Sequence, residues 1–280
     1  MTVLIPTRLD DALQALADDP ALTVLAGGTD LMVEINAGRR RPVRVLSLRR
    51  LDELRRWWRD GPDVVIGAGT TYATLLTPPL AELAPALAQA ARTVGSPQIR
   101  NTGTIGGNLG TASPAGDTLP VLAALDARVE LATASGRRTL ALDHFVTGPK
   151  RTTLAPDELV TGIRIPVATG PQEFLKIGVR NAMVIAVASC ALVVCPTRQR
   201  VACALGSVGP TPVRDRRAEG WLAKEVDWSA MRVRTQSVAE RFGQRMARAA
   251  LPIDDHRSTA AYRRDATRIL ARRAVERVFS

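Results

Sequence analysis

VGSPQIRNTGTIGGNLGTASPAGDTLP, residues 94–120, is the stretch that sets this chain apart from an ordinary α/β protein. It is dense in Gly, Ser, Thr, Asn and Pro and shows no regular periodicity. A tract of this length inside a compact domain is usually functional or disordered. Ile99, Ile105 and Leu109 are spread through it, so disorder fits poorly. We therefore expect an ordered, ligand-binding segment.

A second glycine stretch, LAGGTDLM at residues 25–32, follows an apolar run that reads as a buried strand. Consecutive glycines permit positive φ and let the backbone approach a ligand closely. Successive N–H groups in such turns form concave sites for phosphate oxygens. Either this loop or GTIGGN, residues 103–108, would by itself read as a tight turn. Together, the two loops favour a diphosphate ligand held mainly by main-chain N–H groups.

Familiar nucleotide and hydrolase motifs are missing from the sequence. Gly67-Ala68-Gly69 begins like the dinucleotide fingerprint, but Tyr72 stands where its third glycine belongs, and there is no G-x-x-x-x-G-K. There is no G-x-S-x-G and no Cys–His dyad, and His144 and His256 read as structural histidines. Ligand loops without acid–base residues indicate that a bound cofactor carries the chemistry.

Composition excludes several further classes of protein. The 280 residues are 46% hydrophobic and 23% charged, as in a folded protein, and only 4% aromatic. Cys190, Cys195 and Cys203 have no paired spacing, which argues against disulfides, structural zinc and an iron–sulfur cluster in this chain. No run reaches the ~18 apolar residues of a membrane span, and no signal layout opens the sequence. We expect a cytoplasmic protein with no metal site and no catalytic side chain.

The net charge is +11, and residues 201–280 hold 16 of the basic and 9 of the acidic side chains. Such an excess fits nucleic acid, an anionic ligand or an acidic partner, while a solvated basic face is the simplest interpretation. Few aromatic residues and no helix-turn-helix pattern argue against nucleic acid.

Hydrophobic periodicity predicts a mixed chain of helices and strands. Residues 51–63 read as a helix or turn. Thr118-Leu119-Pro120 opens a helix that continues through residues 121–127, and Asp117 stands at its N-cap position, so we expect it to cap that helix. We expect the boundary between two domains near residues 168–171. Strands are expected at 22–26, 43–48, 64–69, 129–134, 158–166, 174–180, 184–194 and 201–209, and helices near 10–16, at 31–38 and 75–92, and through the last seventy residues.

In this order and spacing the motifs resemble the flavin (medium, or M) subunit of the molybdenum hydroxylases, the family of xanthine dehydrogenase and aerobic carbon monoxide dehydrogenase. The resemblance covers essentially the whole chain. It rests on LAGGTDLM (25–32), GAGTTYATLL (67–76), SPQIRNTGTIGGNLGTASPAGDTLPVLAAL (96–125), ELVTGIRIP (158–166), FLKIGVRNAMVIA (174–186), ALGSVGPTPVRDRRAE (204–219) and the closing segment DDHRSTAAYRRDATRILARRAVERV (254–278).

The resemblance implies an α+β fold. An FAD-binding domain at residues 1–170 would consist of two α/β subdomains, about 1–55 and 56–170, of the vanillyl-alcohol-oxidase type. A C-terminal flavoprotein domain at 171–280 would carry a three-stranded antiparallel sheet with helices.

It also implies the cofactor site. The two glycine loops would wrap the FAD diphosphate, and Thr111 and Asp117 would contact its diphosphate and ribose ends. Gly95, Val160 and Lys176 would line the adenine or flavin, and Lys176 would favour the reduced flavin anion. The implied set is Leu25, Ala26, Gly27, Gly28, Thr29, Asp30, Leu31, Met32, Gly95, Thr104, Ile105, Gly106, Gly107, Asn108, Thr111, Asp117, Val160 and Lys176.

The implied function is electron transfer within a heterotrimer. FAD would sit in this chain, iron–sulfur clusters in a small partner subunit and molybdopterin in a large one, with NAD or another compound as acceptor. The basic C-terminal third would then face partner subunits. A purine, carbon monoxide, an aldehyde and an N-heterocycle are all open as substrates. The rival interpretations are a free-standing flavin oxidoreductase and a basic nucleic-acid-binding protein.

Overall fold

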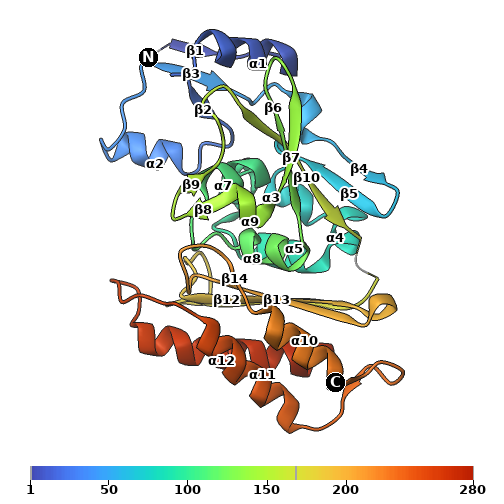
Figure 1. The fold of residues 1–280 in the computed structure, drawn as a ribbon. Helices are drawn as coiled ribbons and strands as arrows, with labels where there is room; N and C mark the ends of the chain where they lie inside the picture. The colour runs from blue at the N-terminus through green and yellow to red at the C-terminus, as the bar shows by residue number, and fades with distance from the viewer. Residues whose placement is uncertain (1, 168, 280) are drawn as a thin grey trace.

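Three sheets organise the chain in the computed structural model, which describes residues 2–167 and 169–279 (Figure 1). The first is a small parallel sheet in the order β1–β3–β2, with helices α1 and α2 in its connections. Helix α1 turns Leu9, Ala12, Leu13 and Leu16 inward because these apolar residues recur at helical spacing. The elements are β1 (Thr2–Leu4), α1 (Leu9–Asp18), β2 (Thr23–Leu25), α2 (Leu31–Asn36) and β3 (Arg44–Ser47).

The second sheet is antiparallel and five-stranded, in the order β4–β5–β10–β6–β7. Its strands are β4 (Trp57–Asp60), β5 (Asp63–Gly67), β6 (Arg128–Ala132), β7 (Arg137–Ala141) and β10 (Leu159–Pro166). Short helices fill the connection from β5 to β6 and pack beneath this sheet (Figure 1). They are α3 (Tyr72–Leu75), α4 (Leu80–Leu83), α5 (Pro85–Thr93), α6 (Pro97–Thr102), α7 (Ile105–Thr111) and α8 (Thr118–Ala124); α9 (Leu142–Phe145), β8 (Val146–Gly148) and β9 (Arg151–Thr152) follow β7.

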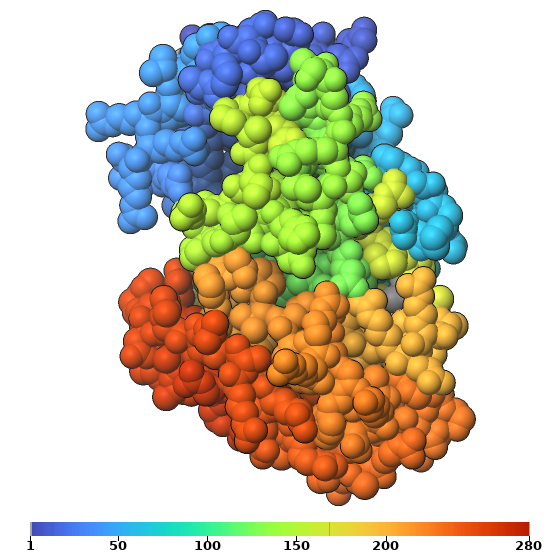
Figure 2. All heavy atoms as spheres, in the orientation of Figure 1, coloured from blue at the N-terminus to red at the C-terminus, as the bar shows by residue number. Residues whose placement is uncertain are grey.

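The third sheet is antiparallel, in the order β11–β12–β13–β14. It lies between the two halves of the molecule, which Figure 2 shows as a blue-to-green upper part and an orange-to-red lower part. Residues on β12 alternate between its faces: Ala191 and Val193 join the core of the N-terminal half, whereas Cys190 and Leu192 join the C-terminal core. The elements are β11 (Gln172–Ile177), β12 (Ala188–Cys195), β13 (Arg200–Gly206), β14 (Val213–Arg214), α10 (Arg216–Lys224), β15 (Val226–Asp227), β16 (Arg232–Val233), α11 (Ser237–Ala249) and α12 (Ala260–Val278).

The predicted α+β architecture is confirmed, with local corrections. Residues 97–102 and 105–111 are short helices, although the tract lacks visible periodicity. The helix expected over 75–92 is broken into α3, α4 and α5, because Pro78, Pro79 and Pro85 cannot continue a helix. Within 51–63 the chain forms a 3₁₀ turn and strand β4, and β1, β7 and the two-residue β14 were not expected. The described C-terminal sheet therefore has four strands rather than three. The last seventy residues are not helical throughout, because the short antiparallel pair β15–β16 separates α10 from α11.

Among the described residues, no helix combines the length and the apolar composition that crossing a bilayer demands.

An arginine cluster on Asp126 joins the two halves across the third sheet. Asp126 follows α8, and its carboxylate accepts hydrogen bonds from Arg200, from Arg214 at 2.6 Å and from Arg216 at 3.1 Å. Arg214 also binds Glu219 at 2.7 Å. Burial acts to raise the pKa of Asp126, but the guanidinium groups of Arg200 and Arg214 outweigh it and hold that pKa below its ordinary value.

We expect Asp126→Asn to lower the free energy of unfolding by about 1–2 kcal/mol at neutral pH, a modest figure because 34% of the side chain is exposed. The wild-type carboxylate has a lowered folded-state pKa. Its stabilisation is therefore complete above the unfolded value of about 4 and disappears as the pH falls through the folded value. Urea titrations at neutral and acidic pH measure this, and a difference that stayed constant with pH would contradict it.

Candidate functional site

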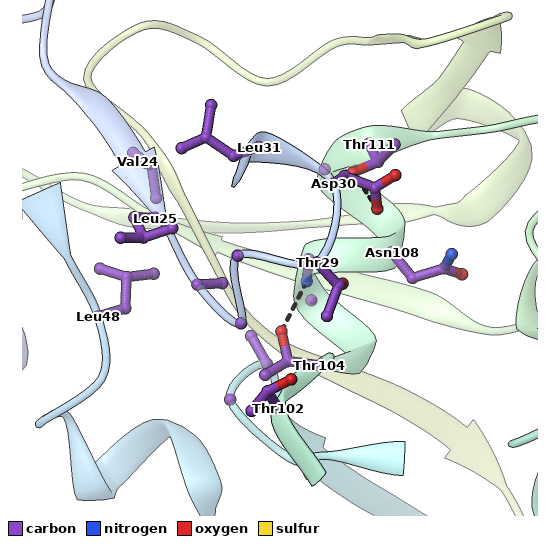
Figure 3. Close-up of a pocket in the computed structure, with 18 of the residues that line it drawn as sticks. Val24, Leu25, Thr29, Asp30, Leu31, Leu48, Thr102, Thr104, Asn108 and Thr111 are labelled. Atoms are coloured by element: carbon purple, nitrogen blue, oxygen red, sulfur yellow. Dashed lines mark hydrogen bonds between the residues drawn. The ribbon is translucent and has the colours of Figure 1, made fainter. Parts of the chain in front are cut away.

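A cavity of about 810 Å³ lies where the first sheet meets α7 and strand β10 (Figure 3). This volume is typical of a ligand or cofactor site. The loop from β2 into α2 forms one wall, and residues 104–111 form the facing wall. A Cβ atom placed on Gly107 would lie 3.7 Å from the Cβ of Ala26, so the two glycine loops stand directly opposite each other.

The first glycine loop leaves its main chain open toward the cavity. The N–H groups of residues 27–30 donate to no acceptor in the part of the chain that the structure describes. Gly27 cannot be replaced without movement, because a Cβ there would lie 2.0 Å from the carbonyl oxygen of Thr102. Gly28 has a φ of +77°, which favours glycine. Four adjacent N–H groups without partners form an anion cradle.

The second glycine loop is built differently from what we expected. Its amides are already used: Ile105 N donates to Thr70 O at 3.0 Å, Gly106 N to Ala68 O at 2.9 Å, and Gly107 N to Thr104 Oγ1 at 3.0 Å. Gly106 is needed because a Cβ there would lie 2.6 Å from the carbonyl oxygen of Ala68. The glycines of this loop therefore serve close packing, and the loop supports the first one.

Charge around the cavity is biased toward anions. Four cationic side chains and two acidic ones line it. Lys150 binds Glu34 at 2.9 Å, and this contact lowers the pKa of Glu34. Among the remaining cations, Arg40 also lowers the pKa of Glu34, and Arg55 lies 3.6 Å from Asp52 outside the lining. Asp30 accepts a hydrogen bond from Thr111 Oγ1 at 3.4 Å. The charged lining residues are Asp30, Glu34, Arg40, Arg49, Arg55 and Lys150, and an apolar part is formed by Leu48, Leu54, Leu159 and Val160.

The structure brings most of the predicted site residues together at this cavity. Those that line it are Leu25, Ala26, Gly27, Gly28, Thr29, Asp30, Leu31, Met32, Thr104, Gly106, Gly107, Asn108, Thr111 and Val160. Ile105 is fully buried in the core instead. Gly95 forms a positive-φ turn against Ile99, and Asp117 and Lys176 also lie outside the lining.

Asp117 and Lys176 form a buried ion pair. Lys176 Nζ lies 2.5 Å from Asp117 Oδ2 and donates to Thr93 O at 3.2 Å, while Thr93 Oγ1 donates to the same carboxylate at 3.0 Å. Burial raises the pKa of Asp117, and Lys176 opposes that rise. The carboxylate does not cap α8 as predicted: it accepts no hydrogen bond from the helix, and the backbone of Asp117 is helical, with φ −62° and ψ −33°, whereas an N-cap residue has an extended backbone. Its second oxygen, Oδ1, is buried without a partner in the described chain.

Several lining residues escaped sequence reasoning. Arg40, Arg49, Arg55 and Lys150 are scattered along the chain, and the cavity alone unites them. Tyr72 also lines the cavity. The sequence marks this residue only by its place in the interrupted dinucleotide fingerprint, where it stands in the position of the third glycine.

The fold and the cavity together define an α+β protein with a site for an extended, phosphate-containing ligand. Within residues 2–167 and 169–279, no three His, Cys, Asp or Glu side chains are grouped as metal ligands. Comparison with known proteins identifies the class. Residues 1–168 match the FAD binding domain in molybdopterin dehydrogenase, and residues 173–278 match the carbon monoxide dehydrogenase flavoprotein C-terminal domain. The chain therefore belongs to the FAD-binding medium subunits of the molybdenum hydroxylase family of oxidoreductases.

Relatives match between two thirds and nearly all of the chain. The glyceraldehyde dehydrogenase medium chain of Sulfolobus acidocaldarius is 32% identical over 275 residues, covering 96% of this chain and 95% of the relative. The carbon monoxide dehydrogenase medium chain of Hydrogenophaga pseudoflava is 34% identical over 199 residues, or 68% of each chain. A solved carbon monoxide dehydrogenase structure from that organism superposes with a TM-score of 0.88 at 28% identity, covering 99% and 96% of the two chains.

Gly106→Ala tests the close contact between the second loop and Ala68. We expect a loss of about 1–3 kcal/mol in the free energy of unfolding, because the overlap with Ala68 outweighs the better helix propensity of alanine. Gly220→Ala in α10 is the matched control. Its Cβ meets nothing within 4 Å, so this variant should gain up to about 1 kcal/mol. Urea unfolding compares them, and equal stability of Gly106→Ala and the wild type would contradict the prediction.

The buried ion pair is tested by a double-mutant cycle. Lys176→Met and Asp117→Asn should each cost about 3 kcal/mol, because each leaves a buried polar partner uncompensated. The cycle is closed with Lys176→Met and Asp117→Leu, each made alone and then together. The double variant should cost clearly less than the sum of these two single changes. Additive losses in urea titrations would show that the two groups do not interact.

Proposed function

We propose that this chain is the electron-transfer subunit of a heteromeric molybdenum hydroxylase. It takes electrons from iron–sulfur clusters of a partner and passes them to NAD or another acceptor. The open N–H groups of residues 27–30, which line a cation-biased cavity, are the observation that carries this proposal. FAD, when bound, supplies the redox chemistry, and the chain's own residues bind and orient it.

The residues present fit such a dinucleotide. The first glycine loop would donate its N–H groups to phosphate oxygens, with Arg40, Arg49 and Arg55 compensating their charge. The apolar side chains near Val160 suit a planar ring system. Asp117 Oδ1 is an acceptor buried without a partner, but Asp117 lies outside the cavity lining, so the contact with the ribose that the resemblance implies stays a prediction. Lys176 was expected to favour the reduced flavin anion. Because its ammonium group is paired with the Asp117 carboxylate, its positive charge is largely compensated and would stabilise that anion less.

Several relatives carry names that mark them as one chain of several, including the nicotinate dehydrogenase FAD-subunit of Eubacterium barkeri. For this chain we propose a small iron–sulfur partner and a large molybdopterin partner. Cys190 and Cys203 lie fully buried, with their sulfur atoms 3.6 Å apart, and Cys195 is at the far end of β12. Three cysteines placed in this way do not supply the usual four cluster ligands, so clusters would come from a partner.

Reconstitution with FAD tests the cofactor assignment. Apo-protein titrated with FAD should bind it in equimolar amount, with the flavin absorption bands retained after gel filtration. ADP should compete, because it shares the diphosphate. A preparation that refuses FAD both alone and with its co-expressed companion chains would overturn the proposal.

Assembly is tested separately. Affinity purification of the tagged chain from its own cells should recover a cysteine-rich small chain and a large molybdenum-containing chain, detected by mass spectrometry and metal analysis. FAD binding without any such companion would instead favour a free-standing flavin oxidoreductase.

A further inference from the structure

Tyr72 is held rigidly at the edge of the cavity. It opens helix α3, and the preceding Thr71 caps this helix by accepting a hydrogen bond from Thr74 N at 3.2 Å. Tyr72 N donates to Gly103 O at 3.1 Å. Its ring lies against Gly103 so closely that a Cβ there would be 2.8 Å from the ring carbon Cε2. Both backbone and ring are therefore fixed next to the second glycine loop.

No hydrogen bond among the described residues involves the hydroxyl of Tyr72, although the residue is only 5% exposed and lines the cavity. The hydroxyl oxygen is not one of the fully buried atoms that lack a partner, so it is open to the cavity, and a tyrosine hydroxyl in such a site usually finds a partner. The protein supplies no such acceptor here. The cavity that Tyr72 shares with Thr104 and Gly107 is where an acceptor would enter.

Electrostatics keep this phenol protonated. Burial raises the pKa of Tyr72 far above its ordinary value, and the nearby carboxylates of Asp117 and Asp30 raise it further. Its O–H is therefore a neutral donor at any physiological pH. A phenol that stays protonated can always donate a hydrogen bond to a ligand oxygen.

We infer that the Tyr72 hydroxyl is a positioning group that donates a hydrogen bond to a phosphate oxygen of the bound dinucleotide. This inference rests on the proposed function. It adds a side-chain donor from the β5–α3 turn to the open N–H groups of the first glycine loop, and it gives a role to the residue that replaces the third glycine of the dinucleotide fingerprint.

Tyr72→Phe removes only the hydroxyl and keeps the ring that packs on Gly103. Tyr262→Phe is the matched control, since Tyr262 is the second tyrosine of the chain and lies 51% exposed on α12. We expect Tyr72→Phe to weaken the Kd for FAD about tenfold, as for loss of one hydrogen bond to a charged group, and Tyr262→Phe to leave it unchanged. Urea unfolding of the apo-proteins should show no loss in Tyr72→Phe.

Phosphorus NMR distinguishes a hydrogen bond from Tyr72 to the FAD phosphates from a role of the tyrosine in packing alone. The resonances of bound FAD should shift in Tyr72→Phe and stay in place in Tyr262→Phe. An unchanged Kd overturns the inference, and so does a weakened Kd with unmoved phosphorus resonances or with an equally destabilised apo-protein. If the wild type itself does not bind FAD, the proposed function fails. If it binds FAD and Tyr72→Phe binds it equally, only this inference fails.

Discussion

The close approach of Gly27 to the backbone at Thr102 is the constraint on which the cavity depends. Any side chain at Gly27 would overlap the Thr102 carbonyl, so the first glycine loop can rest on the α6–α7 segment only if residue 27 is glycine. Gly106 repeats this requirement against Ala68 one layer below. The two contacts stack three backbone segments from different parts of the chain. The N–H groups of residues 27–30, which have no acceptor in the described chain, belong to a loop that is packed on one side and lines the cavity.

The third sheet explains why the helical C-terminal third is part of the same structure. Both faces of β12 are buried, and its alternate residues belong to different cores. Helices α5 and α8 cover one face, while α10 and α12 cover the other. Lys176 on β11 reaches Asp117 at the start of α8 across this boundary. The ion pair beside the cavity therefore depends on the docking of both halves.

The sequence predicted the two glycine loops, and its resemblance to the flavin subunits predicted the fold class and a site set of which most members line the cavity, because the motifs involved are short local patterns. It did not predict that the first loop has N–H groups without partners whereas the glycines of the second loop serve close packing. Glycine is used both for open N–H groups, as at Gly28, and for close packing, as at Gly106, and the sequence looks the same in the two cases. It also missed the role of Asp117, since an acidic residue before a helix reads as an N-cap until Lys176 is found beside it. Contacts between residues far apart in the chain carry no local signature.

The positive charge after residue 200 is a second feature whose role cannot be inferred from local sequence patterns. The arginine excess after residue 200 reads as a surface for partners, but much of it is used inside the chain. Arg214 is nearly buried between Asp126 and Glu219, and Arg263 holds Asp255 at 2.6 Å while donating to the carbonyl of Ser207. Their guanidinium groups satisfy several acceptors at once, which a lysine could not do with the same geometry. Part of the net positive charge therefore belongs to the architecture that joins α10 and α12 to the sheet, and only the remainder is free to act on other molecules.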